Sequence, residues 1–322
     1  MTTNEIVPAG VAPLALPDGL ADQTRAYADS AHSEATRRAY RSDWRDFSGW
    51  CKAHGLAVLP ATAETVALYL AAQIKAGRKT ATVQRRLASI GQAHLVAGYS
   101  SPGEHPGVRA TMRGIRRKIG VGQEQVSPAT TDVIRLMVGA LPDTLLGARD
   151  RALLLLGFAS ALRRSELVAL DRADLLFARE GVIVRIVRSK TDQEGAGREV
   201  GVAYGLRPET CPVRALQQWI QAAGITSGPV FRNVDRHGRV LGRLTPQSVR
   251  LIVQRAAAAA GLDPEQYGGH SLRAGLATSA AEAGAEERHI MEQTGHRSQA
   301  VARRYIRRGS IWRDNVSGKV GL

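Results

Sequence analysis

A helical repeat of apolar side chains in the first third of the chain is the feature that most limits its fold. Tyr40, Trp44, Phe47 and Cys51 follow one another at the i, i+4, i+7 and i+11 spacing of one face of an amphipathic helix. Similar patterns, bounded by suitable cap and stop residues, continue to residue 119. This region is therefore predicted to be all helical, with helices between Ser33 and Gly55 and at 63–76, 80–97 and 108–119.

The rest of the chain mixes helices with a few short strands. Residues 175–178, 182–187 and 199–203 have the composition of strands, and the last two are expected to form a hairpin across 189–197. Helices are expected at 131–141, 148–161, 209–223, 245–260, 271–283, 286–293 and 298–308. The predicted fold class is mainly α with two domains: one is helical, and the other is α+β with a small three-stranded antiparallel sheet.

Changes in composition predict where the domains begin and end. Residues 1–30 are rich in Ala, Pro and Gly and are expected to form a flexible N-terminal tail. The stretch 120–128 is typical of a linker. The two domains then cover 31–119 and 129–322, and the second is expected to end in a tail helix.

Positive charge is concentrated in the predicted helical domain. The chain has a formal net charge of +15, and residues 31–120 hold fifteen Lys or Arg against five acids. No acid interrupts the stretch from Lys75 to Ser101, although a merely solvated helix face normally mixes both signs. Such a surface binds polyanions because Lys and Arg release the counterions condensed on phosphates. We expect double-stranded DNA to be the partner, in contact with Arg37, Arg38, Arg41, Lys79, Arg85, Arg86, Arg113, Arg116, Arg117 and Lys118.

Several other classes of protein are disfavoured. Cys51 and Cys211 do not have the spacing of metal ligands. Two isolated cysteines of this kind are typical of a reduced cytosolic chain. No run of 18 apolar residues is present to span a membrane, and the N-terminus lacks the basic and apolar regions of a secretory signal. We expect a cytoplasmic, nucleoid-associated protein with no membrane partner and no structural metal.

Two clusters in the middle of the chain carry basic side chains at the ends of predicted elements. Arg163 and Arg164 follow an apolar helix, and Glu166 is a ready ion-pair partner for a basic residue at this helix end. Lys190 lies at the tip of the predicted hairpin, where a lysine is usually only solvated but is also able to protonate a leaving oxygen. Neither cluster is informative alone.

Two further clusters lie closer to the C-terminus. His270 and Arg273, at i and i+3, project from one helix face, where histidine can move a proton and arginine can hold two phosphate oxygens. His296 precedes Tyr305 by nine residues, and Tyr305 lies on a strongly basic predicted helix. Each pair also occurs by chance, and a helical tyrosine is more often packed in a core than catalytic.

Taken together, the order and spacing of these residues resemble the tyrosine recombinase (phage integrase) family, closest to its Cre-like branch. Members carry Arg, a Lys on a β-hairpin, HxxR, a His or Trp, and Tyr in this order. The matching residues here are Arg163, Lys190, His270, Arg273, His296 and Tyr305, with Glu166 as the acid that follows the first arginine by three residues. The resemblance covers about 33–310, because the basic helical domain is similar to the family's core-binding domain.

The sequence departs from the family pattern near its first arginine. Ala161 stands where many members have glycine, two residues before that arginine. Arg164 leaves the identity of the first arginine open by one residue, and the spacing to Glu166 favours Arg163.

The resemblance implies a site-specific DNA recombinase, or integrase, that cuts and rejoins DNA. Tyr305 would attack a phosphodiester and form a 3′-phosphotyrosine. Arg163, Arg273 and His296 would bind the phosphate, and Lys190 would protonate the 5′-oxygen. His270 would take up the tyrosine proton, and Glu166 would orient either Arg163 or His270. The family also implies four protomers on two DNA sites, a Holliday junction, and no metal, cofactor or ATP.

Three alternatives remain open. A type IB topoisomerase-like enzyme would share the chemistry but relax DNA without exchanging partners, and a catalytically silent relative would only bind DNA. A metal-dependent nuclease using His270, His289 and His296 is the least favoured, because the surrounding arginines would repel a divalent cation. The target sequence and the biological role of the reaction are not legible in the sequence.

Overall fold

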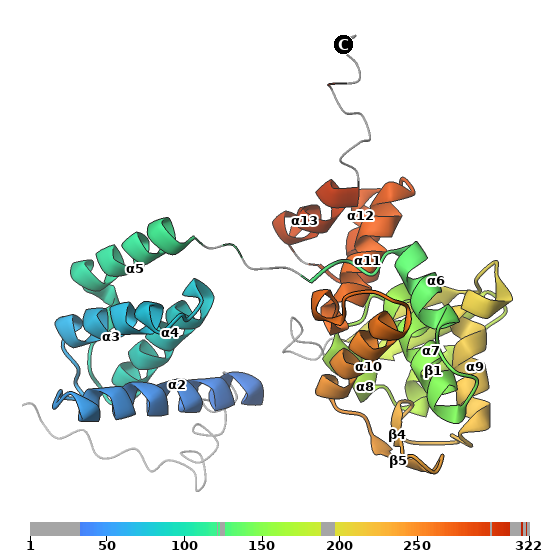
Figure 1. Cartoon of the computed structure of the whole chain (residues 1–322), viewed down its shortest axis with the longest axis horizontal. Coiled ribbons are helices and arrows are strands. Elements are labelled where there is room, and N and C mark those ends of the chain that lie inside the picture. The colour runs from blue at the N-terminus through green and yellow to red at the C-terminus, as the bar shows by residue number, and fades with distance from the viewer. Residues whose placement is uncertain are drawn as a thin grey trace, which may run out of the picture. The chain divides into compact units, whose positions relative to one another are not determined.

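The computed structural model describes residues 33–120, 122, 126–187, 197–296, 298–309, 317 and 320. The predicted N-terminal tail, Lys190 and the predicted tail helix beyond residue 310 lie outside the described residues. The chain divides into two compact units, Met1–Gln123 and Glu124–Leu322, which are considered separately (Figure 1). Among the described helices, none combines the length and the apolar character needed to cross a lipid bilayer.

The first unit is a helical bundle, as the sequence pattern predicts. Ser33 begins its first helix by accepting a hydrogen bond from the backbone N–H of Thr36 at 3.2 Å. The apolar faces meet in a core that contains Phe47, Tyr69 and Ile90. The described elements are α2 (Glu34–Ala53), α3 (Ala63–Lys75), α4 (Thr80–Val96), the 3-10 helix η1 (Pro102–Glu104) and α5 (Pro106–Ile119).

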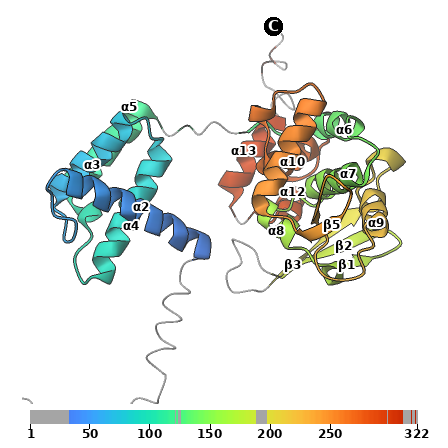
Figure 2. The ribbon, with the colours of Figure 1, turned by 60° about the horizontal axis from the view of Figure 1, so that its bottom comes forward.

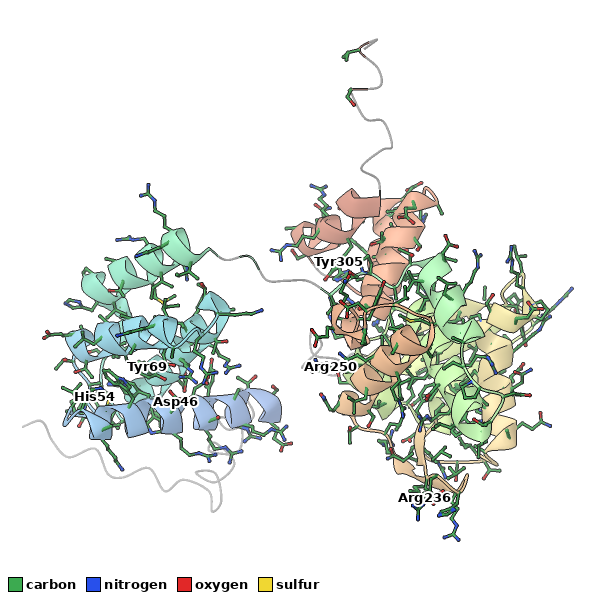
Figure 3. The ribbon with its side chains drawn as sticks, in the orientation of Figure 1. Asp46, His54, Tyr69, Arg236, Arg250 and Tyr305 are labelled. Atoms are coloured by element: carbon green, nitrogen blue, oxygen red, sulfur yellow. The ribbon has the colours of Figure 1, made fainter. Side chains whose placement is uncertain are left out.

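One basic residue of this unit lies inside the bundle. The prediction that Arg86 contacts DNA is wrong, because the residue is only 8% exposed. Its Nη1 donates to the Tyr69 hydroxyl at 2.9 Å and also to Asp46 and Gln73, and Figure 3 shows Tyr69 and Asp46 within the bundle. A buried guanidinium requires such acceptors, so Arg86 joins α2, α3 and α4 rather than facing a ligand.

The second unit is built mainly from helices around one large core. Leu153, Leu154 and Leu156 of α7 are fully buried, together with Trp219 of α9 and Phe231. The described helices are α6 (Thr131–Gly139), α7 (Leu145–Ala159), α8 (Arg164–Ala169), α9 (Pro212–Ala222), α10 (Pro246–Ala259), α11 (Gly269–Glu282), α12 (Glu287–Thr294) and α13 (Gln299–Gly309), with 3-10 turns η2 (Arg172–Asp174), η3 (Pro208–Thr210) and η4 (Pro264–Gln266).

A small antiparallel sheet completes this unit, in the order β1-β2-β3 (Figure 2). Its strands are β1 (Leu175–Phe177), β2 (Gly181–Ile186) and β3 (Arg198–Ala203). Val182 pairs with Val202 across the hairpin, and both side chains are buried against the helices. The predicted fold class, mainly helical with a three-stranded antiparallel sheet, is confirmed.

The sequence analysis missed a second hairpin, β4 (Arg232–Val234) and β5 (Val240–Arg243). Its turn is organised by Asp235, whose carboxylate accepts hydrogen bonds from the backbone N–H groups of His237 at 2.8 Å and Arg239 at 2.9 Å. The strands are too short and too polar to give an alternating pattern, so periodicity alone does not find them.

A glycine of α11 lets the chain that enters the second unit pass close to this helix. A Cβ at Gly275 would lie 1.9 Å from the carbonyl oxygen of Ala129. The backbone N–H of Ala129 in turn donates to the carbonyl of Ser271 on α11 at 2.9 Å. A side chain at position 275 would therefore displace the chain from the helix that carries His270 and Arg273.

Candidate active site

The side chains of Tyr305 and His270 meet across two helices of the second unit. The Tyr305 hydroxyl on α13 lies 2.6 Å from Nε2 of His270 at the start of α11. Ile306, next to Tyr305, packs with it against a small core that includes Ala281 and Ile290 of α11 and α12. This apolar contact fixes α13, so the hydroxyl is aimed at the imidazole by packing.

His296 completes the surroundings of Tyr305. Its ring stacks on the tyrosine ring, with the centroids 5.9 Å apart and the planes 22° apart. Nδ1 of His296 lies 2.7 Å from the hydroxyl of Thr294 at the end of α12. Between them Gly295 has a φ of +64°, a left-handed conformation that turns the chain out of α12 and that glycine adopts readily.

Arg273 lies one turn after His270 on α11 and is only 2% exposed. Its Nη1 donates to the carbonyl of Ala161 at 2.8 Å. Ala161 follows the end of α7 with a φ of +50°, the only positive value at a non-glycine residue in the described part of the chain. This is the position where the sequence departs from the family's glycine, and the left-handed backbone explains why glycine suits it.

Arg163 and Glu166 form a compact pair at the start of α8. Nη1 of Arg163 donates to one carboxylate oxygen at 2.6 Å, and the backbone N–H of Arg163 donates to the other at 2.9 Å. Glu166 is 4% exposed, whereas Arg163 is half-buried. Of the two adjacent arginines, Arg163 bonds Glu166 and Arg164 is exposed, in agreement with the choice made from spacing.

Positive charge dominates this cluster and sets its proton affinities. Burial, followed by the charge of Arg163, lowers the pKa of Arg273 to about 10. Burial and then Arg273 lower the pKa of His296 to about 4. His270 as a whole residue is exposed, but partial burial of its ring among protein atoms, followed by the charge of Arg273, lowers its pKa below the usual 6.5. Both imidazoles are therefore neutral at pH 7.

Tyr305 is protonated in this setting. Partial burial raises the pKa of its hydroxyl, and this outweighs the opposing charges of Arg273 and Arg304. With a protonated tyrosine and a neutral His270, the O–H donates to Nε2 of the imidazole. The tyrosine thus needs a base to become a nucleophile, and a neutral base is in contact with it.

Arg198, at the start of β3, was missed by the sequence analysis. Its Nη1 donates to the carbonyl of Gln293 at 3.3 Å, and its Nη2 lies 3.7 Å from a Glu166 carboxylate oxygen. Burial lowers its pKa. One weak signal was available: an arginine follows the predicted hairpin turn directly, but nothing in the local pattern shows which way it points.

The structure brings together five of the six predicted catalytic residues, together with Glu166, while Lys190 lies outside the described residues. On the first unit, the predicted DNA-contacting residues other than Arg86 are exposed: Arg37, Arg38, Arg41, Lys79, Arg85, Arg113, Arg116, Arg117 and Lys118. Arg85 also bonds the Asp43 carboxylate at 2.8 Å and 3.0 Å.

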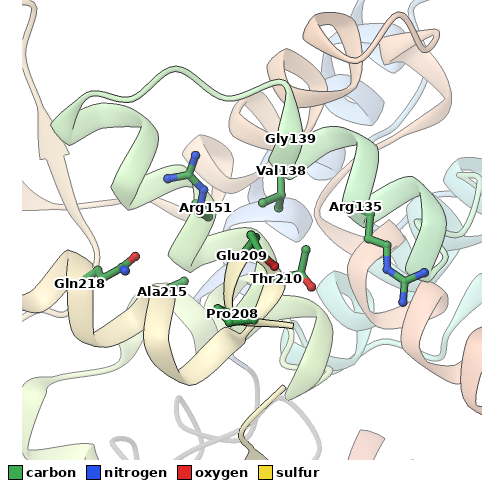
Figure 4. A pocket seen from close by; sticks show the side chains of 9 residues that line it. All are labelled: Arg135, Val138, Gly139, Arg151, Pro208, Glu209, Thr210, Ala215 and Gln218. Carbon is green, nitrogen blue, oxygen red and sulfur yellow. The ribbon is translucent and has the colours of Figure 1, made fainter. Parts of the chain in front are cut away.

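One pocket of the second unit lies apart from this cluster. A pocket between α6, α7, η3 and α9 is lined by Arg135, Arg151 and Glu209 among others, and by none of the predicted catalytic residues (Figure 4). Within the part of the chain that the structure describes, no three His, Cys, Asp or Glu side chains gather as a metal site would require.

Comparison with known proteins places this arrangement in a family. The model of the Phage integrase family matches residues 129–309, and that of the Phage integrase N-terminal SAM-like domain matches residues 27–94. The integrase/recombinase xerD homolog of Selenomonas ruminantium is 40% identical over 297 residues, covering 91% of this chain and 87% of that protein. The recombinase cre of Escherichia phage P1 is 25% identical, covering 86% and 85%.

A solved structure shares the fold. The integrase of transposon Tn1549, in its complex with transposon right-end DNA, has a TM-score of 0.63 at 14% identity, covering 88% of this chain and 92% of that one. The chain therefore belongs to the phage integrase family. It is a tyrosine recombinase, an enzyme of DNA recombination and integration.

Proposed function

We propose that this enzyme cuts and rejoins duplex DNA at a specific site through a 3′-phosphotyrosine formed by Tyr305. The observation that carries the proposal is the 2.6 Å contact between the Tyr305 hydroxyl and Nε2 of His270, beside buried Arg273. A protonated tyrosine, a neutral base and a cationic phosphate site thus lie in one cluster.

In the proposed cleavage step, a bond forms between Tyr305 Oη and the phosphorus while the bond from phosphorus to the 5′-oxygen breaks. His270 takes the phenolic proton, and Lys190 donates a proton to the departing 5′-oxygen. The role of Lys190 stays a prediction from the sequence. The covalent intermediate retains the energy of the broken bond, so that a second 5′-hydroxyl can attack it without ATP.

Charge on the reacting phosphate would be held by the arginine cluster. Arg273 and Arg163 lie among few carboxylates, and Glu166 neutralises only part of their charge. An incoming phosphate supplies the missing negative charge, which increases further in the pentavalent transition state. The Thr294 hydroxyl donates to the Ile290 carbonyl and therefore accepts from Nδ1–H of His296, so the other ring nitrogen of His296 can donate to the phosphate only when the imidazole is protonated. The negative charge of a bound phosphate favours that protonation.

The exposed arginines and lysines of the first unit would hold the DNA backbone. Lys79, Arg113, Arg116, Arg117 and Lys118 gather at the start of α4 and along α5 without an acid among them. The related Tn1549 integrase is described in complex with DNA, in line with this role. By the same relationship we propose four protomers on two sites, strand exchange through a Holliday junction, and work at the nucleoid.

The proposal is tested by trapping the covalent intermediate. The protein is incubated with end-labelled genomic DNA of its own host in excess EDTA and quenched with SDS, and covalent adducts are counted. Tyr305→Phe is compared with Tyr204→Phe as a matched control. The lost Tyr204 hydroxyl accepts a hydrogen bond from Gln217 at 3.3 Å and lies outside the candidate active site. Sequencing of the trapped fragments identifies the cleavage site.

We expect metal-independent adducts with wild type and Tyr204→Phe and none with Tyr305→Phe. Adducts that persist in Tyr305→Phe would mean another nucleophile. Binding without adducts in wild type would indicate a silent DNA-binding relative. Relaxation of supercoiled DNA without exchange between two sites would instead indicate a nicking-closing enzyme.

A further inference from the structure

Arg198 occupies a place where three parts of the active site meet. It begins β3, opposite Ile186 of β2. Its Nη1 bonds the Gln293 carbonyl in the last turn of α12, and its Nη2 faces the buried carboxylate of Glu166. Arg198 therefore connects the sheet both to the segment that carries His296 and to the partner of Arg163.

The turn that presents His296 is shaped around this guanidinium. A Cβ on Gly295 would lie 2.9 Å from Cζ of Arg198 and 3.1 Å from its Nε. The guanidinium therefore rests on the backbone of Gly295, directly before His296. Removing the arginine would leave a space under the turn, and the stacking of His296 on Tyr305 would lose its support.

Arg198 is poorly suited to stabilising the fold. Its Nε and Nη2 are buried and make no hydrogen bond within the described residues. The distance of 3.7 Å to Glu166 is too long for one. Glu166 attracts its charge, but the charges of Arg163 and Arg273 oppose it. Buried donors without acceptors and repulsion between like charges are both unfavourable, and such violations are expected where a site serves function.

We propose that Arg198 is a positioning residue for DNA cleavage, which holds the Gly295–His296 turn against Tyr305 at the expense of stability. The inference rests on the proposed phosphotyrosine chemistry. Arg198 acts through His296, so its loss should slow the chemical step and leave DNA binding unchanged.

The test replaces Arg198 by methionine, which keeps an unbranched side chain and removes the guanidinium with its charge and donors. The matched control is Arg185→Met, which removes an arginine from the neighbouring strand β2, where it makes an exposed pair with Glu199 at 2.8 Å. Cleavage is measured in single turnover at saturating concentrations of the duplex recovered by trapping. DNA affinity is measured by fluorescence anisotropy, and stability by thermal unfolding of the DNA-free protein.

We expect Arg198→Met to cleave about 10- to 100-fold more slowly, the usual effect of a small misplacement in an active site. DNA affinity should stay within about twofold of wild type, and the thermal midpoint should be unchanged or higher, since an unsatisfied buried cation is removed. Arg185→Met should resemble wild type. A scaffold residue would instead lower the midpoint and the rate together.

A double-mutant cycle with His296→Ala tests the route of the effect. If Arg198 acts through His296, the double variant should be no slower than His296→Ala alone. The proposal would be overturned if the losses in the double variant were fully additive. It would also be overturned if Arg198→Met had a lower thermal midpoint, weakened only DNA affinity, or left the cleavage rate unchanged. If wild type forms adducts and Arg198→Met cleaves at the wild-type rate, only this inference is refuted. If wild type forms no adducts, the proposed function is refuted.

Discussion

The two units of the molecule bury an arginine in opposite ways. Arg86 in the first unit lies against the carboxylates of Asp46 and Asp43, with Gln73 as a further acceptor. Arg273 in the second unit is buried more deeply, but it bonds a backbone carbonyl and has Arg163 as a neighbouring charge. The lowered pKa of Arg273 reflects this difference.

The comparison separates a cation that serves the fold from one that serves a ligand. A buried cation that is paired with carboxylates serves the fold, because removing it leaves a carboxylate without its ion-pair partner. A buried charge surrounded by other cations is electrostatically incomplete until an anion arrives, and such sites are where phosphate and its transition state are best bound. Substitutions of Arg273 and Arg86 test this distinction directly.

The largest effect is expected at Arg273. Arg273→Met should reduce the rate of covalent adduct formation by about 10³-fold, since a preorganised cation on the transition-state oxygens is lost. Its free energy of unfolding should be unchanged or higher by about 1 kcal/mol, because repulsion from Arg163 is relieved. The rate comes from SDS-quenched time courses and the stability from urea unfolding. A variant that unfolds and loses activity in parallel would contradict the distinction.

Arg86→Met should show the reverse pattern. Its loss leaves Asp46 without an ion-pair partner and Gln73 without its donor, whereas Asp43 keeps Arg85, so the free energy of unfolding should fall by about 2 kcal/mol. The adduct yield per folded molecule should stay close to wild type when measured well below the unfolding midpoint. Arg45→Met, at an exposed position of the same unit that is not among the predicted DNA contacts, is the control for losing an arginine. Unchanged stability in Arg86→Met would show that the buried network is not structural.

The third prediction concerns pH. The pKa of His270 is lowered below 6.5, so the imidazole is neutral and able to accept the tyrosine proton above that value. As the pH falls through the lowered pKa, the base becomes protonated and the cleavage rate should drop, by roughly tenfold for each further unit. Rate–pH profiles should be flat from about pH 7 to 8. In His270→Asn the rate should be low and this acid limb absent. An identical limb in that variant would assign it to another group.

The smallest effect is expected at Ala161. Its left-handed backbone is unfavourable for alanine, so Ala161→Gly should raise the free energy of unfolding by about 0.5–1 kcal/mol. Ala159→Gly, at the last residue of α7, should lower it by about 1 kcal/mol, because glycine is a poor helix former there. Cleavage should be retained in Ala161→Gly, since the carbonyl that holds Arg273 stays in place. Destabilisation by Ala161→Gly would show that the strain is absent.

Local patterns in the sequence were sufficient for most helices, although not for the short α8, and for the order of the site residues. The amphipathic spacing of Tyr40, Trp44 and Phe47 and the cap at Ser33 act within a few residues, so they can be read without a structure. The family resemblance then predicted that His270 and Tyr305, 35 residues apart, serve one reaction, and the structure brings them to 2.6 Å.

Only the tertiary structure decided which basic side chains are buried and what they meet. Nothing in the local sequence distinguishes Arg86 from its basic neighbours. In the fold it is buried and donates hydrogen bonds to Asp46 and Gln73, which are 40 and 13 residues away in the chain. Arg198 meets Gln293 across 95 residues of chain. The helical spacing is a property of a short segment, whereas the burial of a charge depends on acceptors brought by distant segments, and local sequence carries no record of them.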